Sequence, residues 1–382
     1  GGARSRRVDG DGERGAGRHG LSGCAEGQTA VIDDLASVSS RIAAWLAARH
    51  ADAAPVAVSG LTRSDAGYSN VTLLGDLHWQ RDGRAETLGI VLRMQPQEAS
   101  VFPDCDIVRQ YRVLKGLAGS AVPVPRLLGL EESAALLGGA FFVMERVGGR
   151  VPRENPPYHV EGWFHDLSES ERRRHWFEGI DTVAAVARVD WRESGLGFLQ
   201  PPAGTTALAR QLEYYRRAVL WAESLGRPYP HLHAGYRWLV ANQPADNTLA
   251  LSWGDAKLGN CVFRDGRLVA ALDWELATLA HPVDDLAWWL MLDESLCTGY
   301  GLPRLAGLPT RAESVARWEQ ASGFSARDLG YYDVFAAWRM AYVMARIGTV
   351  FTRRGWVAPE AEMDRRNGGA TLLAVHAARL GF

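Results

Sequence analysis

The stretch that decides the fold of this chain is Leu251-Ser-Trp-Gly-Asp255-Ala-Lys257-Leu-Gly-Asn260-Cys-Val-Phe-Arg-Asp-Gly-Arg-Leu-Val-Ala-Ala-Leu-Asp273-Trp-Glu275. Its first apolar strand is predicted to end at Asp255, and Asn260 opens the next strand five residues later. The Asp265-Gly266 pair predicts a tight turn, after which a third apolar strand ends at Asp273. We therefore expect Asp255, Asn260 and Asp273 to converge at one mouth of a small sheet.

These three polar side chains suit the transfer of a phosphoryl group. Carboxylate and amide oxygens are hard ligands, which favour Mg²⁺ bridging phosphates over zinc. A remaining carboxylate can accept a hydrogen bond from a hydroxyl nucleophile and hold it in line. Phosphoryl transfer depends mainly on positioning and on charge neutralisation, so this division of roles matches what the reaction requires.

The same residues resemble the catalytic loop of the aminoglycoside phosphotransferase-like enzymes, a branch of the protein-kinase-like fold. That loop reads roughly H-G-D-x-x-x-x-N followed by L-D-W/F-E/D, and the matching residues here are Gly254, Asp255, Asn260, Leu272, Asp273, Trp274 and Glu275. The resemblance extends over about residues 36–380 and is closest in style to bacterial proteins related to the kinase-like domain fused to acyl-CoA dehydrogenases. It implies an α+β, two-lobed, protein-kinase-like fold, with a small antiparallel-sheet lobe before a larger, mainly helical lobe.

The resemblance also implies a role for each polar residue of the loop. Asp255 would orient or deprotonate the acceptor hydroxyl, and Lys257 would neutralise charge on the transferring phosphoryl group. The implied metal ligands are Asn260, Asp273 and Glu275.

Two neighbouring positions complete this part of the resemblance. In His281-Pro282-Val283-Asp284-Asp285-Leu286-Ala287, the second acid, Asp285, would support the catalytic loop through its backbone. Trp253 stands where the family has a histidine, which in kinases mainly packs and forms hydrogen bonds, so an active enzyme remains the expectation.

The N-terminal lobe is predicted to span residues 32–147. Its strands are expected at Val56–Leu61, Val71–Gln80, Glu86–Gln95, Arg126–Leu130 and Phe141–Val147, with a helix at 104–117. By resemblance, the Gly67-Tyr68-Ser69-Asn70 turn would lie over the nucleotide phosphates, and the linker through Val147 would bind the adenine edge. The implied nucleotide-binding residues are Ser69, Asn70, Arg93, Gln110, Glu145 and Val147.

The basic residues narrow the choice of phosphate-binding groups. Only Lys115 and Lys257 are lysines, and all the other basic residues are arginine. Kinases place a phosphate-clamping lysine on a strand of the sheet lobe, so here the clamp is Arg93 or is absent. Arginine keeps the charge and can bind phosphate through two parallel hydrogen bonds. The usual helix partner of the clamp, a glutamate, is replaced by Gln110.

The rest of the chain indicates a soluble, cytoplasmic protein. A net charge of −2 argues against nucleic-acid or anionic-membrane partners. Residues 1–31 read as a disordered tail because their composition offers little apolar surface to bury. Residues 148–382 are expected to form the catalytic and substrate lobe, and the oligomeric state is left open. The helices of this lobe are predicted at about 169–190, 206–225, 231–242, 283–296, 311–322, 328–351 and 359–379.

Together these features predict an ATP- and Mg²⁺-dependent phosphotransferase acting on a hydroxyl of a small molecule, with GTP as the open alternative to ATP. Candidate acceptors are a hydroxyacyl-CoA, a macrolide or another alcohol. The arginine-rich segment 150–240 favours a neutral or anionic acceptor over a polycationic aminoglycoside, and its arginines include Arg150, Arg153, Arg172, Arg173, Arg174, Arg216 and Arg217. The alternative function is a catalytically silent, nucleotide-binding pseudokinase module, suggested by Trp253, Arg93 and Gln110 together.

Overall fold

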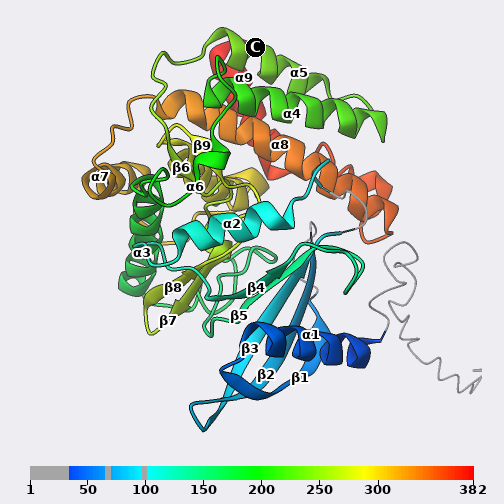
Figure 1. Cartoon of the computed structure of the whole chain (residues 1–382). Coiled ribbons are helices and arrows are strands. Elements are labelled where there is room, and N and C mark those ends of the chain that lie inside the picture. Colours follow the sequence, from blue (N-terminus) through cyan, green and yellow to red (C-terminus); the bar gives the residue numbers. More distant parts are fainter. Residues whose placement is uncertain (1–33, 65–69, 97–100) are drawn as a thin grey trace, which may run out of the picture.

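The computed structural model describes residues 34–64, 70–96 and 101–382. Within these ranges the chain has the predicted two-lobed α+β arrangement, with an antiparallel sheet at one end and a larger helical portion at the other (Figure 1). The predicted tail at 1–31 and the turn residue Ser69 lie outside the described residues. The lobe boundary at residue 147 stays a prediction.

The N-terminal sheet has five strands in the order β1-β2-β3-β5-β4, all antiparallel. Their bounds are β1 Ala53–Arg63, β2 Val71–Arg81, β3 Arg84–Met94, β4 Leu127–Glu131 and β5 Phe141–Glu145. The β2–β3 turn uses Asp82 and Gly83, both at positive φ, as a hairpin of this kind requires. This sheet places Arg93 near the inner end of β3.

Two helices pack against the sheet lobe in different ways. Helix α1 (Leu35–Arg49) shares an apolar core with the sheet, to which it contributes Ile42 and Leu46. Helix α2 (Ile107–Leu117) lies between the sheet and the helical portion (Figure 1), and its buried side chains belong to the large core of that portion. Helix α2 therefore links the two lobes.

The quoted stretch forms β6 (Ala250–Ser252), β7 (Cys261–Arg264) and β8 (Arg267–Ala271). The prediction of one small sheet is wrong, because β7 pairs with β8 while β6 pairs with β9 (Thr278–Ala280). The chain turns after β8 through Asp273, whose φ is +61°, and returns beside β6. The two ladders still flank the same loop.

The helices of the larger lobe begin and end within a few residues of the predicted positions, with one exception. They are α3 Glu169–Ala187, α4 Ala207–Ser224, α5 Pro230–Ala241, α6 Asp284–Leu296, α7 Arg311–Ser322, α8 Leu329–Arg353 and α9 Gly368–Leu380. The helix predicted at 359–379 is wrong over its first part, because Glu362 adopts a left-handed backbone conformation after a short 3-10 turn. Asn367 then caps α9 by accepting a hydrogen bond from the Ala370 N–H at 2.8 Å.

Helix α6 forms the centre of the larger lobe. All but one of its residues are buried, as is typical of a helix surrounded by others. Its second residue, Asp285, bonds to Ser252 of the predicted catalytic loop. Its first, Asp284, binds Arg339 of α8, and α8 packs along α6. Within the described ranges, none of the helices is long and apolar enough to cross a membrane.

The contact between α3 and α6 depends on the absence of a side chain at Gly179. A Cβ atom there would lie 2.1 Å from Cη2 of Trp289, so an added methyl group has no room. We expect Gly179→Ala to lower the free energy of unfolding by about 1–3 kcal/mol through overpacking, despite the better helix propensity of alanine. Denaturant unfolding of the purified variant measures this change.

Gly330 on α8 supplies the matched control. It is exposed, and nothing lies within 4 Å of its ideal Cβ position. Gly330→Ala should therefore be neutral or stabilise by up to about 1 kcal/mol. Equal unfolding midpoints for the two variants would contradict the packing argument.

Candidate active site

The carboxylate of Asp255 is held from three sides. Asn260 Nδ2 donates to Oδ2 at 2.8 Å, Trp288 Nε1 donates to Oδ1 at 2.9 Å, and Lys257 Nζ lies 3.4 Å from Oδ2. The structure thus brings together Asp255, Lys257 and Asn260, as the loop spacing predicts. No local sequence pattern marks the Trp288 indole as a partner of the loop.

Lys257 lies between two carboxylates. Its Nζ donates to Glu154 Oε2 at 3.1 Å as well as contacting Asp255. Burial alone would lower the pKa of Lys257, but the charges of Asp255 and Glu154 outweigh burial and raise it. The amine is therefore a fixed cation beside the predicted catalytic carboxylate. Sequence reasoning missed Glu154, which follows the Gly148-Gly149 linker and carries no motif.

Arg93 faces the predicted metal ligands across the two lobes. Its NH1 lies 3.1 Å from Asp273 Oδ1, and its NH2 lies 3.8 Å from Glu275 Oε2. The side chain is 14% exposed. Burial opposes its charge, yet Asp273 and Glu275 outweigh burial and raise the pKa of Arg93. The predicted clamp and two of the three predicted ligands, Asp273 and Glu275, therefore lie together.

Two other residues predicted to bind the nucleotide, Gln110 and Asn70, lie in surroundings that the sequence does not predict. Gln110 is buried, and neither atom of its amide has a hydrogen-bond partner among the residues that the structure describes. It therefore does not replace glutamate as a partner of Arg93. Asn70 Nδ2 donates to Glu275 Oε2 at 2.8 Å, and its Oδ1 accepts from the Cys105 thiol. Asn70 is thus tied to a predicted metal ligand.

Within the described ranges, the linker between the lobes leaves backbone groups of Val147 free. Glu145 is fixed by its N–H on Arg126 O at 2.8 Å and by its carboxylate on Arg126 Nε at 3.1 Å. Arg146 N–H donates to Gly89 O at 2.7 Å. Val147 comes next in the chain, and its N–H and C=O have no hydrogen-bond partner among the residues that the structure describes. This segment can offer both groups to a base edge.

Asp285 supports the loop through hydrogen bonds to its backbone, as the family resemblance implies. Its carboxylate accepts the N–H of Trp253 at 2.6 Å, the N–H of Gly254 at 2.9 Å and the hydroxyl of Ser252 at 2.9 Å. Burial, and next the charge of Asp284, raises the pKa of Asp285 to about 6. Three donors on one carboxylate fix the backbone that carries Asp255.

Arg339 of α8 is a second support that sequence reasoning missed. Its NH2 donates to Gly254 O at 2.8 Å, and its NH1 donates to Asp284 Oδ1 at 3.1 Å. The side chain is buried, and its guanidinium lies 4.5 Å from the centre of the Trp288 ring. Arg339 therefore connects α8 to both the loop and the start of α6.

Trp253 joins the two halves of the catalytic stretch. Its Nε1 donates to Leu272 O at 2.7 Å, one residue before Asp273. Its ring stacks on Trp274, with centres 5.2 Å apart and planes inclined by 18°. A tryptophan at this position supplies both packing and a hydrogen bond, which are the two functions expected of the family's histidine.

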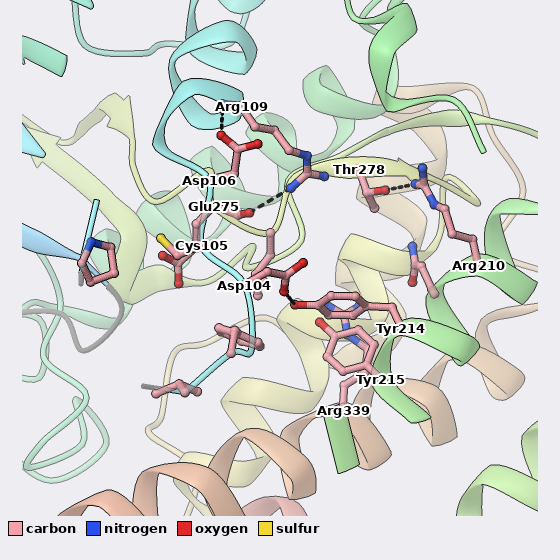
Figure 2. Close-up of a pocket in the computed structure, with 15 residues that line it drawn as sticks. Asp104, Cys105, Asp106, Arg109, Arg210, Tyr214, Tyr215, Glu275, Thr278 and Arg339 are labelled. Carbon is pink, nitrogen blue, oxygen red and sulfur yellow. Dashed lines mark hydrogen bonds between the residues drawn. The ribbon is translucent and has the colours of Figure 1, made fainter. Parts of the chain in front are cut away.

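A cavity of about 300 Å³ lies next to the loop (Figure 2). It is bounded by the segment before α2, by α4, by residues 275–278 and by Arg339. Glu275 lines the cavity, and Arg339, which also lines it, donates to Gly254 O, so the cavity lies next to residues that hold the loop. Its size suits part of a small molecule.

Other clusters with metal-binding residue types are occupied by protein contacts. Asp246, His281 and Asp328 place ligand atoms within 4.8 Å of one another. However, Val283 N–H donates to His281 Nδ1, which leaves the proton of a neutral ring on Nε2, and Arg327 already lies 3.3 Å from Asp246 Oδ2. His233, which the sequence places two residues after His231, pairs with Glu223 at 2.9 Å.

A model of the phosphotransferase enzyme family matches residues 65–324. The chain is 29% identical over 269 residues to acyl-CoA dehydrogenase family member 11 of Rattus norvegicus, with coverage of 68% of this chain and 32% of that protein. The corresponding Homo sapiens protein is 30% identical over 203 residues, which cover 52% of this chain and 24% of that protein. The chain thus spans at most about a third of the length of these relatives.

Solved structures share the fold. A proposed aminoglycoside phosphotransferase from Ralstonia eutropha JMP134 is 25% identical with a TM-score of 0.66, covering 89% of this chain and 98% of that one. A mutant of aminoglycoside phosphotransferase APH(4)-Ia with AMP-PNP and hygromycin B is 15% identical (TM-score 0.52, coverage 89% and 99%). The GDP complex of aminoglycoside 2'-phosphotransferase-IIIa is 12% identical (TM-score 0.54, coverage 90% and 99%). These likenesses confirm the predicted kinase-like fold.

The raised pKa of Asp285 predicts a pH dependence of stability. A carboxyl whose pKa is raised from 3.8 to about 6 in the folded state contributes fully below pH 3.8, and its contribution is lost as the pH rises through 6. At 1.36 kcal/mol per pKa unit, this loss amounts to about 3 kcal/mol. The stability of the wild-type protein relative to Asp285→Asn should therefore decrease by about that amount between pH 4 and pH 7.

Unfolding free energies measured at half-unit pH steps for both proteins give this difference directly. Asp285→Ala, which also removes the carboxyl, should show the same pH dependence relative to wild type. If the wild-type and Asp285→Asn curves run parallel over this range, the carboxyl is not the titrating group.

Proposed function

The chain belongs to the phosphotransferase enzyme family, and within it we propose a Mg²⁺-dependent kinase that transfers the γ-phosphate of ATP to a hydroxyl of a small molecule. The observation that carries this proposal is the contact of Asp255 with both Lys257 and Asn260, together with the ion pair between Arg93 and Asp273. We assign nucleotide binding mainly to residues 32–147, and catalysis and most of the substrate contacts to residues 148–382.

Asp255 is suited to orient the acceptor hydroxyl and to take its proton. Trp288 and Asn260 fix both of its carboxylate oxygens through single hydrogen bonds, which leaves further lone pairs to accept the hydroxyl. A base placed in this way acts by geometry first and by proton affinity second. Lys257 stays protonated beside it and neutralises negative charge on the transferring group.

Asn260, Asp273 and Glu275 fit a magnesium ion by the chemistry of their donors. Asn260 gives its Nδ2 to Asp255, so its Oδ1 is the atom left to face a metal. Together with the two carboxylates it offers only oxygen ligands, as Mg²⁺ prefers. When bound, the ion would supply positive charge that neutralises the phosphates of the nucleotide. Arg93, already beside Asp273, would contribute a second positive charge.

Nucleotide binding is supported from two directions. The free backbone groups of Val147 offer one donor and one acceptor to a base edge. The similar APH(4)-Ia structure contains AMP-PNP, and the 2'-phosphotransferase-IIIa structure contains GDP. We propose ATP as the donor for this chain.

The alternative of a silent nucleotide-binding module rests on Trp253, Arg93 and Gln110. Trp253 donates a hydrogen bond to Leu272 O and so connects the loop to the segment that carries Asp273. Arg93 lies 3.1 Å from Asp273, one of the predicted metal ligands. Of the three departures, Gln110 alone loses its expected contact. These contacts favour the active enzyme.

Substitutions at the two acids test the proposal. Asp255→Asn should lower kcat by about 10²- to 10⁴-fold, the usual contribution of a general base, while AMP-PNP still stabilises the protein. Asp273→Asn should abolish turnover. In addition, it should remove the Mg²⁺ dependence of the AMP-PNP-induced rise in Tm. ATP consumption with a panel of hydroxylated compounds and thermal shift with and without Mg²⁺ measure both effects.

Asp265→Asn is the matched control. Asp265 lies exposed in the β7–β8 turn with φ +52°, a conformation that asparagine also tolerates. Its activity and its thermal shift should equal those of the wild type. Full activity in Asp255→Asn refutes the proposed mechanism, and a wild-type protein that shifts without Mg²⁺ and turns over nothing is a silent module.

A further inference from the structure

The cavity beside the catalytic loop contains two arginines without an acidic partner. Arg109 of α2 donates to Glu275 O at 3.2 Å and to Ala277 O. Arg210 of α4 donates to Leu199 O at 2.7 Å and to the Thr278 hydroxyl. Neither forms an ion pair with any residue in the described ranges, and Figure 2 shows both guanidinium groups beside the segment that carries Thr278.

Holding these two cations together is unfavourable in the free protein. Burial lowers the pKa of Arg109, and burial together with the charge of Arg109 lowers the pKa of Arg210. Neutral oxygens stabilise a guanidinium less than a carboxylate or phosphate does. An anion that reaches both groups would therefore relieve repulsion and replace weaker hydrogen bonds with charge-assisted ones.

The acids that line the same cavity are engaged elsewhere. Asp104 and Asp106 are exposed; Asp104 accepts the Tyr214 hydroxyl at 2.8 Å, and Asp106 accepts the Arg109 N–H as the cap of α2. Glu275 is bound by Asn70 and lies near Arg93. Arg339, the third lining cation, is paired with Asp284. The positive charge left without a partner is thus that of Arg109 and Arg210.

The rest of the cavity is aromatic and contains one unused acceptor. Phe102 and Tyr215 are buried, and Tyr214 lies beside them. Gln211 is 8% exposed, and its buried Oε1 has no hydrogen-bond partner among the described residues. The lining therefore fits a ligand with an apolar body, a hydrogen-bond donor and a negatively charged group.

We propose that the acceptor substrate is an anionic alcohol whose carboxylate or phosphate group binds Arg109 and Arg210. This inference rests on the proposed kinase function and adds the class of its acceptor. The acceptor oxygen attacks the γ-phosphorus of ATP, the bond from that phosphorus to the ADP oxygen breaks, and the hydroxyl proton passes to Asp255. The products are ADP and the phosphate ester of the anionic alcohol. A polycation, by contrast, would meet two unpaired arginines.

Matched probes test the charge of the acceptor directly. The anionic probes are 6-hydroxyhexanoate and 6-hydroxyhexyl phosphate, the neutral probe is methyl 6-hydroxyhexanoate, and the cationic probe is 6-aminohexan-1-ol. Calorimetric titration into the protein with AMP-PNP and Mg²⁺ measures binding, and ATP consumption measures turnover. We expect one or both anions to bind about 10-fold or more tightly than the ester and the amine, and the better anion identifies the preferred group.

Variants assign that preference to the two arginines. Arg210→Gln should weaken binding of the anion about 10-fold and leave the ester unaffected, and Arg210→Lys should restore part of the loss. Arg109→Gln should act in the same direction. Arg217→Gln is the control, since Arg217 lies on the same helix, is 69% exposed and points its charge at Glu213. An unchanged AMP-PNP-induced rise in Tm shows that each variant is folded.

The outcomes separate this inference from the proposed function. Anion binding that depends on Arg210, without turnover of any probe, supports the anion site and counts against the kinase. Turnover confined to the ester or the amine supports the kinase and overturns the anion site. The anion site is also overturned if no anion binds, or if Arg210→Gln and Arg109→Gln bind the anions as wild type does.

Discussion

The catalytic loop depends on one buried carboxylate. Asp285 accepts two backbone N–H groups and one hydroxyl from residues 252–254, and no other arrangement on the described chain fixes so many groups of the loop at once. Because a buried acid is costly unless its oxygens are bonded, the loop and the start of α6 stabilise each other. Arg339 extends the same interaction to α8 through Gly254 O. The position of Asp255 is therefore set by helices that follow it in the sequence.

The charges of the site are arranged as two cations, each between two carboxylates. Lys257 lies between Asp255 and Glu154, and Arg93 lies close to Asp273 and Glu275. Each charge is thus neutralised before a substrate arrives, and fixed in place, which is the condition for electrostatic preorganisation. A nucleotide entering with its metal would exchange ionic partners instead of requiring new buried charges. The strand β3 thus places a cation, Arg93, beside Asp273 and Glu275, although it carries no lysine.

Local patterns predict the parts of this site that lie close together in the sequence. The spacing from Asp255 to Asn260 and the strands on either side are visible in the motif itself, and the structure has both. The supports that sequence reasoning missed are contacts over long separations, 103 residues from Glu154 to Lys257 and 85 from Gly254 to Arg339. No period or motif encodes such pairs, since packing of whole helices creates them. The pairing of β6 was also predicted wrongly, because its partner β9 follows Asp273 and lies outside the strands that the motif predicts.

The arginine content of the chain shows why position matters more than number. Several arginines that make segment 150–240 look basic are already engaged: Arg173 pairs with Glu313, Arg216 pairs with Glu213, and Arg172 bonds backbone oxygens. Paired or exposed charges of this kind contribute little to selecting a ligand. The two that remain without an acid beside the loop are Arg210, from this segment, and Arg109, from the opposite lobe. Under the proposed function, selectivity for an acceptor would follow from cations without an ion-pair partner inside the cavity, and composition alone does not identify them.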